Sequence, residues 1–226
     1  MAKHGKKYVE AAKHIDRNKA YTIAEAVELV KKGNYSKFDG SVEMAIKTFA
    51  DPKYNDQMIR ATTILPHGTG KSVKIAVFCS EDKAAEAKAA GADIAGTEVL
   101  LNDIKAGKFG FDVLITTPEN IRDLATVAKQ LGPKGLMPSP KAGTVTQNIV
   151  QTVEEFKKGK MEFKLDKTGN IHGIVGKVSF DAKKLEENIV AFLKAIEENK
   201  PTGIKAKLIK KIVLAPTMGP GIIVAY

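Results

Sequence analysis

The middle of the chain alternates short apolar runs with stretches of helical periodicity. The runs Val73–Cys79 and Asp112–Thr117 are largely apolar, as is typical of strands buried on both faces. Helical spacing and glycine stops predict helices over Glu81–Ala90, over Val99–Ile104 and from Leu124 to Leu131. Strands that alternate with helices indicate a parallel sheet covered on both sides, so we expect a Rossmann-like α/β three-layer domain here.

The two ends of the chain show a different pattern, in which apolar and polar residues alternate. This alternation predicts half-buried antiparallel strands. They are expected over Ser41–Phe49, Met58–Leu65, Met161–Leu165, Ile171–Phe180, Leu208–Leu214 and Gly221–Ala225. Thr22 and Glu25 form a capping box that predicts a helix through Lys32 with Gly33 as its C-cap, and Asp181 is expected to cap a second amphipathic helix. Helices on one side of an antiparallel sheet define an α+β two-layer domain.

Charge follows the same division of the chain. Residues 1–66 carry a net charge of +4, residues 67–159 carry +1 and residues 160–226 carry +5. Neither end is large enough to build a good core alone, so strands from both ends are expected to pair. We therefore predict a discontinuous α+β domain from residues 1–67 plus 159–226, interrupted by an inserted domain at 68–158. The expected hinge residues are Pro66, Gly68, Gly70 and Gly159.

Composition excludes several classes of protein. No run approaches the roughly 20 apolar residues that a membrane-spanning helix needs, so we expect a cytoplasmic protein with no membrane partner. Cys79 is the only cysteine, which excludes a disulfide within the chain and a cysteine zinc site. The four histidines are scattered without metal-ligand spacing. No catalytic set is recognisable, so we expect no enzyme, no metal and no cofactor. The net charge of +10 instead favours a polyanionic partner.

One short stretch raises the possibility of a nucleotide-binding enzyme. Gly68-Thr69-Gly70-Lys71-Ser72 resembles part of a phosphate-binding loop, but the position that requires the first glycine holds Leu65. The stretch also precedes a predicted strand, whereas phosphate binding needs the N–H groups at the start of a helix. We interpret its glycines as turn or hinge residues.

Three polar clusters remain in the two basic ends of the chain. They are Ser36–Glu43, Lys164–Gly173 and Pro216–Pro220. Each can be an ordinary turn. Together they supply lysines for phosphates, hydroxyl and backbone groups for sugars, and an aromatic and a methionine side chain for packing. Folded RNA is recognised by such mixed surfaces, because its accessible groove displays 2′-hydroxyls and shape.

Four segments resemble a known family. Gln130–Lys141 (QLGPKGLMPSPK), Asp166–His172 with the following Gly176-Lys177, Pro216–Pro220 and Leu65–Lys71 are similar to motifs of the L-one family of large-subunit ribosomal proteins, in its bacterial form. The resemblance extends over essentially the whole chain. It implies a two-domain protein, monomeric when free of the ribosome, that binds large-subunit rRNA at the mobile stalk. It also implies a role in releasing deacylated tRNA from the exit site, and repression of the protein's own operon mRNA.

The resemblance also implies which residues bind RNA. The primary RNA-binding face is expected to contain Lys37, Phe38, Ser41, Glu43, Lys164, Lys167, Thr168, His172, Thr217, Met218 and Gly219. Glu43 is interpreted as an acceptor for a 2′-hydroxyl or for a neighbouring side chain. Lys134 and Lys141 are expected to make a secondary RNA contact, although their loop can also be held by internal packing alone. A translation-associated scaffold that acts through protein partners is the alternative function.

Overall fold

A computed structural model describes residues 5–204 and 207–226 of the chain. The chain divides into two compact units. Unit 1 consists of Met1–Gly70 and Glu162–Tyr226, and unit 2 consists of Lys71–Met161. The described strands form sheets of four, two and three strands, so the fold is mixed α/β.

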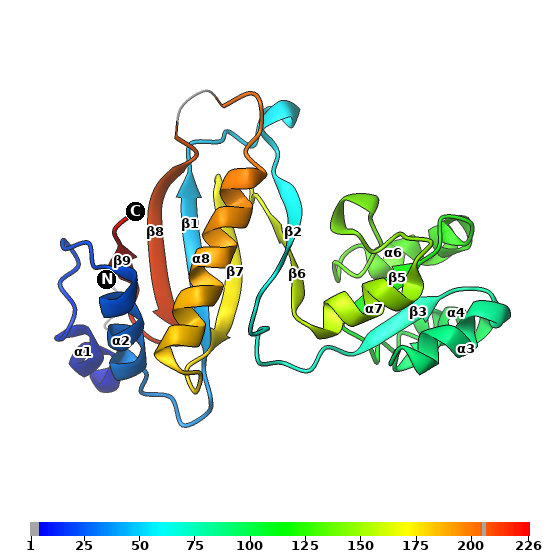
Figure 1. Cartoon of the computed structure of the whole chain (residues 1–226), viewed down its shortest axis with the longest axis horizontal. Coiled ribbons are helices and arrows are strands. Elements are labelled where there is room, and N and C mark those ends of the chain that lie inside the picture. The colour runs from blue at the N-terminus through cyan, green and yellow to red at the C-terminus, as the bar shows by residue number, and fades with distance from the viewer. Residues whose placement is uncertain (1–4, 205–206) are drawn as a thin grey trace. The chain divides into compact units, whose positions relative to one another are not determined.

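Unit 1 is built around an antiparallel sheet in the order β7-β1-β8-β9 (Figure 1). Its strands are β1 (Ser41–Thr48), β7 (Asn170–Lys177), β8 (Ile209–Pro216) and β9 (Ile222–Val224). The separate pair is β2 (Arg60–Ile64) with β6 (Lys160–Lys164), and the short helices are α1 (Lys6–Ala12) and η1 (Asn55–Gln57). Because β1 pairs with β7 on one side and β8 on the other, strands from both ends of the chain join in one sheet, as the sequence predicts.

Two helices cover one face of this sheet, α2 (Ile23–Gly33) and α8 (Ala182–Glu198). The predicted capping box opens α2: the Thr22 hydroxyl accepts the N–H of Glu25, whose carboxylate accepts the N–H of Thr22. Helix α8 buries an apolar face with Leu185, Ile189 and Phe192. Alternate residues of β1 are buried on the same side, so these helices and the sheet enclose the core of unit 1.

Unit 2 contains a parallel sheet in the order β4-β3-β5. Its strands are β3 (Ile75–Phe78), β4 (Ile94–Ala95) and β5 (Val113–Thr116), and its helical elements are α3 (Glu81–Ala89), α4 (Glu98–Lys105), α5 (Ile121–Leu124), η2 (Ala125–Val127), α6 (Ala128–Leu131), η3 (Pro140–Ala142) and α7 (Ile149–Lys157). Ile75 and Val77 pack with α3 and α7, whereas Ala76 and Phe78 pack with α4, α5 and α6. Successive residues of β3 therefore enter cores on opposite faces, which gives three layers.

The region of the single helix predicted from Leu124 to Leu131 is divided in the structure. It consists of α5, one turn of 3-10 helix and α6. Leu124 and Val127 are both buried and lie three residues apart, which is the repeat of a 3-10 helix. The Gly68–Ser72 stretch precedes strand β3 rather than a helix, so it lacks the geometry of a phosphate-binding loop. No helix in the described part of the chain has the length and apolar character needed to span a membrane.

Candidate nucleic-acid interface

The face of the four-stranded sheet that points away from α2 and α8 is rich in polar groups. We call it the open face. Register fixes its composition: Glu43 of β1 lies between Ile174 and Ala215, Ala45 between His172 and Val213, and Lys47 between Asn170 and Lys211. Glu43, Lys47, His172, Ile174 and Lys211 are exposed. Apart from His172, the centre of the face is therefore lined by small and apolar side chains, with charged groups toward both ends.

One end of the open face holds a hydrogen-bonded group that we call the Thr217 cluster, formed by Ser41, Glu43, Thr217, Met218 and Gly219. The Thr217 hydroxyl accepts the N–H of Ser41 at 3.1 Å. The hydroxyl oxygen lies 3.1 Å from Ser41 O and 3.2 Å from a Glu43 carboxylate oxygen, and either of these can accept its proton. Thr217 N–H donates to Ser41 O at 2.9 Å. Glu43 therefore has a hydroxyl neighbour within hydrogen-bond distance, which is compatible with its predicted role as an acceptor for a neighbouring side chain.

The turn after β8 holds Met218 in a strained conformation. Gly219 N–H donates to Pro216 O at 2.9 Å, which closes a four-residue turn. Met218 has a φ of +71° at the third position of this turn, where glycine is the usual residue. The Tyr35 hydroxyl donates to Met218 O and fixes the turn. The Met218 side chain is 67% exposed, so the strained backbone presents an apolar group to solvent.

The loop between α2 and β1 brings two further predicted residues to this end of the sheet. Lys37 and Phe38 are both exposed, and Phe38 is exposed to 56%. Ser36 stabilises the loop by hydrogen bonds within it, because its hydroxyl lies 2.7 Å from Asn34 Oδ1 and 2.9 Å from Phe38 O. An exposed aromatic ring next to a lysine can pack on a sugar or a base while the lysine neutralises a phosphate.

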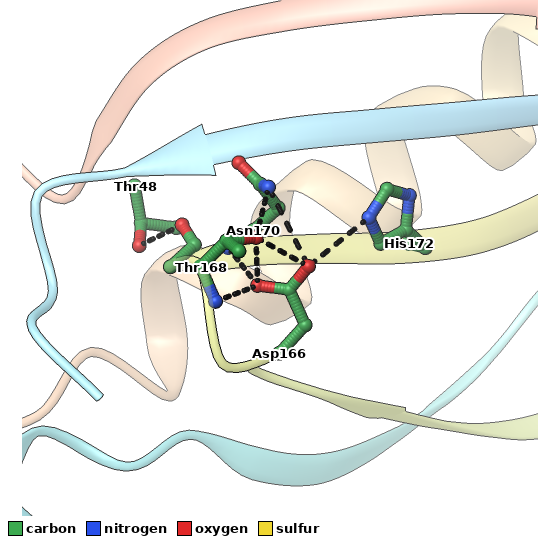
Figure 2. A network of polar contacts seen from close by, with 6 residues as sticks. Thr48, Asp166, Thr168, Asn170 and His172 are labelled. Atoms are coloured by element: carbon green, nitrogen blue, oxygen red, sulfur yellow. Dashed lines mark hydrogen bonds and ion pairs between the residues drawn. The ribbon is translucent and has the colours of Figure 1, made fainter. Parts of the chain in front are cut away.

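The other end of the open face carries the turn between β6 and β7, organised around Asp166 (Figure 2). One Asp166 oxygen accepts the N–H of Thr168 at 2.8 Å and of Asn170 at 2.7 Å, and the Thr168 hydroxyl lies within 2.8 Å of both oxygens. The Nε2 atom of His172 also lies 3.5 Å from the second Asp166 oxygen. Thr48 ties the turn to β1 by donating its N–H and hydroxyl to Gly169 O.

These hydrogen bonds shift the titration of Asp166. Its burial alone would raise the pKa, but the N–H groups of Asn170 and Thr168 and the Thr168 hydroxyl outweigh burial and hold the pKa well below its usual range. Asp166 is therefore fully ionised near neutral pH, and its carboxylate stabilises the turn by accepting hydrogen bonds within it. Lys167 and Thr168 remain exposed at the tip.

The predicted residues form two groups rather than one. Lys167 and Thr168 adjoin the Lys47 end of β1, whereas Thr217 adjoins Ser41 at the other end. Glu43 and Lys47 lie four residues apart on β1, which corresponds to about 13 Å along a strand. His172 occupies the row between them, and Lys164 is exposed on β6, outside the four-stranded sheet.

Two lysines on the open face were missed by sequence reasoning. Lys47 and Lys211 are exposed cross-strand partners at the end of the face nearest the Asp166 turn. Lys47 shares the odd positions of β1 with Ser41 and Glu43, so the two-residue period of the strand could have identified it. Lys211 depends on the register between β1 and β8, which no local pattern gives.

The residues proposed for a secondary contact lie in unit 2. Lys134 and Lys141 are both exposed, and the Lys134 ammonium lies 3.5 Å from the centre of the Phe109 ring. Hydrogen bonds within the loop, such as Leu136 N–H to Leu131 O at 3.1 Å, also hold it internally. Both interpretations of this loop are therefore compatible with its geometry.

The predicted hinge residues lie close to the boundaries of the units. Gly68, Gly70 and Gly159 have φ values of +64°, +75° and +105°. Pro66 directly follows the buried Leu65. Unit 1 reaches Gly70 and resumes at Glu162, so Gly159 lies just inside unit 2.

Two kinds of reactive group can be checked among the described residues, metal-ligand clusters and activated thiols. Within residues 5–204 and 207–226, no three histidine, cysteine, aspartate or glutamate side chains are grouped as a metal site would require. Burial raises the pKa of the Cys79 thiol, the reverse of what a reactive thiolate needs. The fold and the open face together define a basic, mixed α/β protein with an exposed polar sheet surface.

Comparison with known proteins identifies the family. The model of the ribosomal protein L1p/L10e family matches residues 30–220. A protein of Kosmotoga olearia called large ribosomal subunit protein uL1 is 52% identical over 222 residues, covering 98% of this chain and 96% of the relative. Proteins of the same name from Thermosipho africanus and Chlorobium chlorochromatii are 54% and 51% identical, over 98% and 96% of this chain and 96% and 95% of theirs. The chain belongs to the ribosomal protein L1p/L10e family, which confirms the resemblance seen in its motifs.

Proposed function

We propose that this chain is a structural protein of the large ribosomal subunit and binds large-subunit rRNA through the open face of unit 1. Family membership and the printed name of its relatives support the assignment to the subunit. The observation that carries the RNA-binding proposal is the Thr217 cluster, in which a fixed hydroxyl and a carboxylate lie beside the exposed Met218. The cytoplasm is the expected location.

The geometry suggests how each part of the face acts on RNA. Lys37, Lys47, Lys167 and Lys211 neutralise phosphates, and their charges are the sequence-independent part of binding. Glu43 and the Ser41 hydroxyl are placed to bond 2′-hydroxyl groups, which distinguish RNA from DNA. The small residues Ala45, Val213 and Ala215 between the two ends allow the wide, shallow groove of an RNA helix to approach the sheet.

We also propose roles for unit 2, for the hinge residues, and for tRNA and mRNA as further partners. Lys134 and Lys141 make a secondary contact with rRNA in this scheme. Motion at Pro66–Gly70 and around Gly159 lets the stalk move while deacylated tRNA leaves the exit site. The same face binds a similarly folded segment of the protein's own operon mRNA and represses its translation. Free of the ribosome, the protein is a monomer.

A titration against salt tests the electrostatic part of the proposal. With about four lysines on phosphates, the slope of log K against log salt is expected to be about −3, so affinity for a folded stalk rRNA fragment falls about 60-fold between 50 and 200 mM salt. Lys47→Met should bring the slope about one unit closer to zero. Filter binding or calorimetry at four salt concentrations measures this.

The matched control for this titration is Lys183→Met. Lys183 is exposed on α8, which covers the opposite face of the sheet, so its removal should leave the slope unchanged. A flat salt profile for the unaltered protein would show that phosphates are not the main partner. Protein partners captured from lysate that survive ribonuclease treatment would then favour the scaffold alternative.

The strained turn gives a prediction that separates stability from binding. A left-handed conformation costs a residue with a Cβ about 1–2 kcal/mol. Met218→Gly removes this strain, and the added backbone entropy of glycine offsets only about 0.5–1 kcal/mol of the gain. We expect the free energy of unfolding to rise by about 0.5 kcal/mol while RNA affinity falls about 10-fold, since an exposed apolar contact is lost.

Met58→Gly is the control for the stability part of this prediction. Met58 is 48% exposed and has a φ of −71°, so glycine relieves no strain there and should lower stability. If Met218→Gly lowers stability as much as Met58→Gly does, the strain at Met218 is not stored in the native protein. If it binds RNA normally, the Met218 side chain is not part of the interface.

A further inference from the structure

The loop that carries Lys37 and Phe38 is hydrogen-bonded to the turn between β7 and α8. A bulge in β1 and β7 creates this contact. Val42 pairs with Gly176, but the next residue Glu43 pairs with Ile174, so one residue of β7 is passed over. As a result Lys177 lies directly opposite Ser41, at the point where the loop enters β1.

Lys177 makes its polar contacts with the loop. Its ammonium donates to the Ser41 hydroxyl at 3.0 Å and lies 3.4 Å from Asp39 O. Its alkyl stem lies beside Gly70, where an added Cβ would come within 2.7 Å of Lys177 Cγ. The side chain is half-buried, and these contacts direct its charge along the loop rather than out to solvent.

Asp39, which lies in the loop, contacts the same turn through Ser179. Its two carboxylate oxygens accept the N–H and the hydroxyl of Ser179 at 3.2 and 2.9 Å. Val178 N–H donates to Gly40 O at 2.9 Å. Asp39 directly follows Phe38, so this exposed carboxylate lies next to the residues expected to meet RNA. Its negative charge disfavours binding of a polyanion, and its hydrogen bonds to Ser179 supply a different reason for its presence.

We infer that Lys177 and Asp39 are positioning residues for RNA binding, which fix the loop holding Lys37 and Phe38 against the turn formed by residues 177–180. This inference rests on the proposed RNA-binding function. Lys177 acts through Ser41 and Asp39, and Asp39 acts through Ser179. Neither side chain contacts RNA phosphate in this arrangement.

Lys177→Met tests the first residue, because methionine keeps an alkyl stem beside Gly70 and removes the ammonium. We expect about 10-fold weaker binding to a folded stalk rRNA fragment and a slope of log K against log salt equal to that of the unaltered protein. Lys183→Met, on the exposed surface of α8, is the control and should change neither quantity. A double-mutant cycle with Ser41→Ala should show coupling, since the two side chains share one hydrogen bond.

Asp39→Ala tests the second residue through the sign of its effect. Removing a carboxylate beside a polyanion site strengthens binding if only charge matters. Positioning predicts the reverse, about fivefold weaker binding. In the protein without RNA, amide hydrogen exchange at Val178 and Ser179 should accelerate in both variants, because these amides donate to the loop.

The outcomes separate this inference from the function on which it rests. If the unaltered protein binds no RNA, the proposed function fails, and the exchange rates still decide whether the turn fixes the loop. A salt slope closer to zero by one unit in Lys177→Met would make Lys177 a phosphate contact and overturn its positioning role. Tighter RNA binding by Asp39→Ala, or unchanged exchange in both variants, would also overturn the inference.

Discussion

Replacing Thr217 with valine is expected to weaken binding of the stalk rRNA fragment about 100-fold, or about 2.7 kcal/mol, with the fold intact. Valine has nearly the shape of threonine but leaves the Ser41 N–H without its acceptor and Glu43 without its hydroxyl neighbour. The Thr217 N–H still donates to Ser41 O, so the strand pairing survives. Isothermal titration calorimetry measures the loss, and thermal unfolding should show only about 1 kcal/mol of destabilisation.

Thr202→Val supplies the comparison for this substitution. Thr202 is exposed in a loop of unit 1, so the same chemical change there should alter neither affinity nor stability. An affinity for Thr217→Val within twofold of the unaltered protein would remove the Thr217 cluster from the interface. It would also withdraw the main support for the RNA-binding proposal.

The second large effect concerns stability and arises at Asn188. This side chain is fully buried in α8 and satisfies three backbone groups: Oδ1 accepts the N–H of His67 at 3.1 Å, and Nδ2 donates to Gly68 O at 3.0 Å and Val175 O at 2.8 Å. Asn188→Leu leaves all three without partners. At about 1–3 kcal/mol each, partly offset by the apolar burial of leucine, the expected loss in the free energy of unfolding is about 3–5 kcal/mol.

Tyrosine fluorescence can follow this loss in unit 1 alone. The chain has five tyrosines and no tryptophan, and every tyrosine lies outside residues 71–161. Urea unfolding monitored at tyrosine therefore reports on unit 1 even if the two units unfold separately. Lys183→Leu, at an exposed position of the same helix, should lie within about 0.5 kcal/mol of the unaltered protein. A similar result for Asn188→Leu would mean that water replaces the lost partners.

Most elements could be predicted because their signals are local. The capping box at Thr22 and Glu25 and the alternation along β1 each depend on residues within a few positions of one another. Elements with weak local signals were missed, namely the short, lysine-rich α1 and the two-residue β4. The break between α5 and α6 was also missed, because apolar residues three and four apart suit both kinds of helix.

The candidate site was less accessible from the sequence. The turns around Asp166 and Thr217 can be recognised from their residues, but their separation is set by the register of β1 with β7 and β8. The sequence predicts one RNA-binding face that contains both Lys167 and Thr217, whereas in the structure these residues adjoin opposite ends of β1. Lys211 and the Lys177 contact depend on the same long-range pairing, which no window of sequence contains.

The hydrogen bonds between Ser41 and Thr217 join residues 176 positions apart, and this has a consequence for synthesis of the protein. A nascent chain holds β1 early, but the partner strand β8 and the turn after it are synthesised only after the whole of unit 2. A prematurely terminated product therefore lacks half of the Thr217 cluster, however well unit 2 has folded. Under the proposed function, only a product that extends past Gly219 can bind RNA through this cluster.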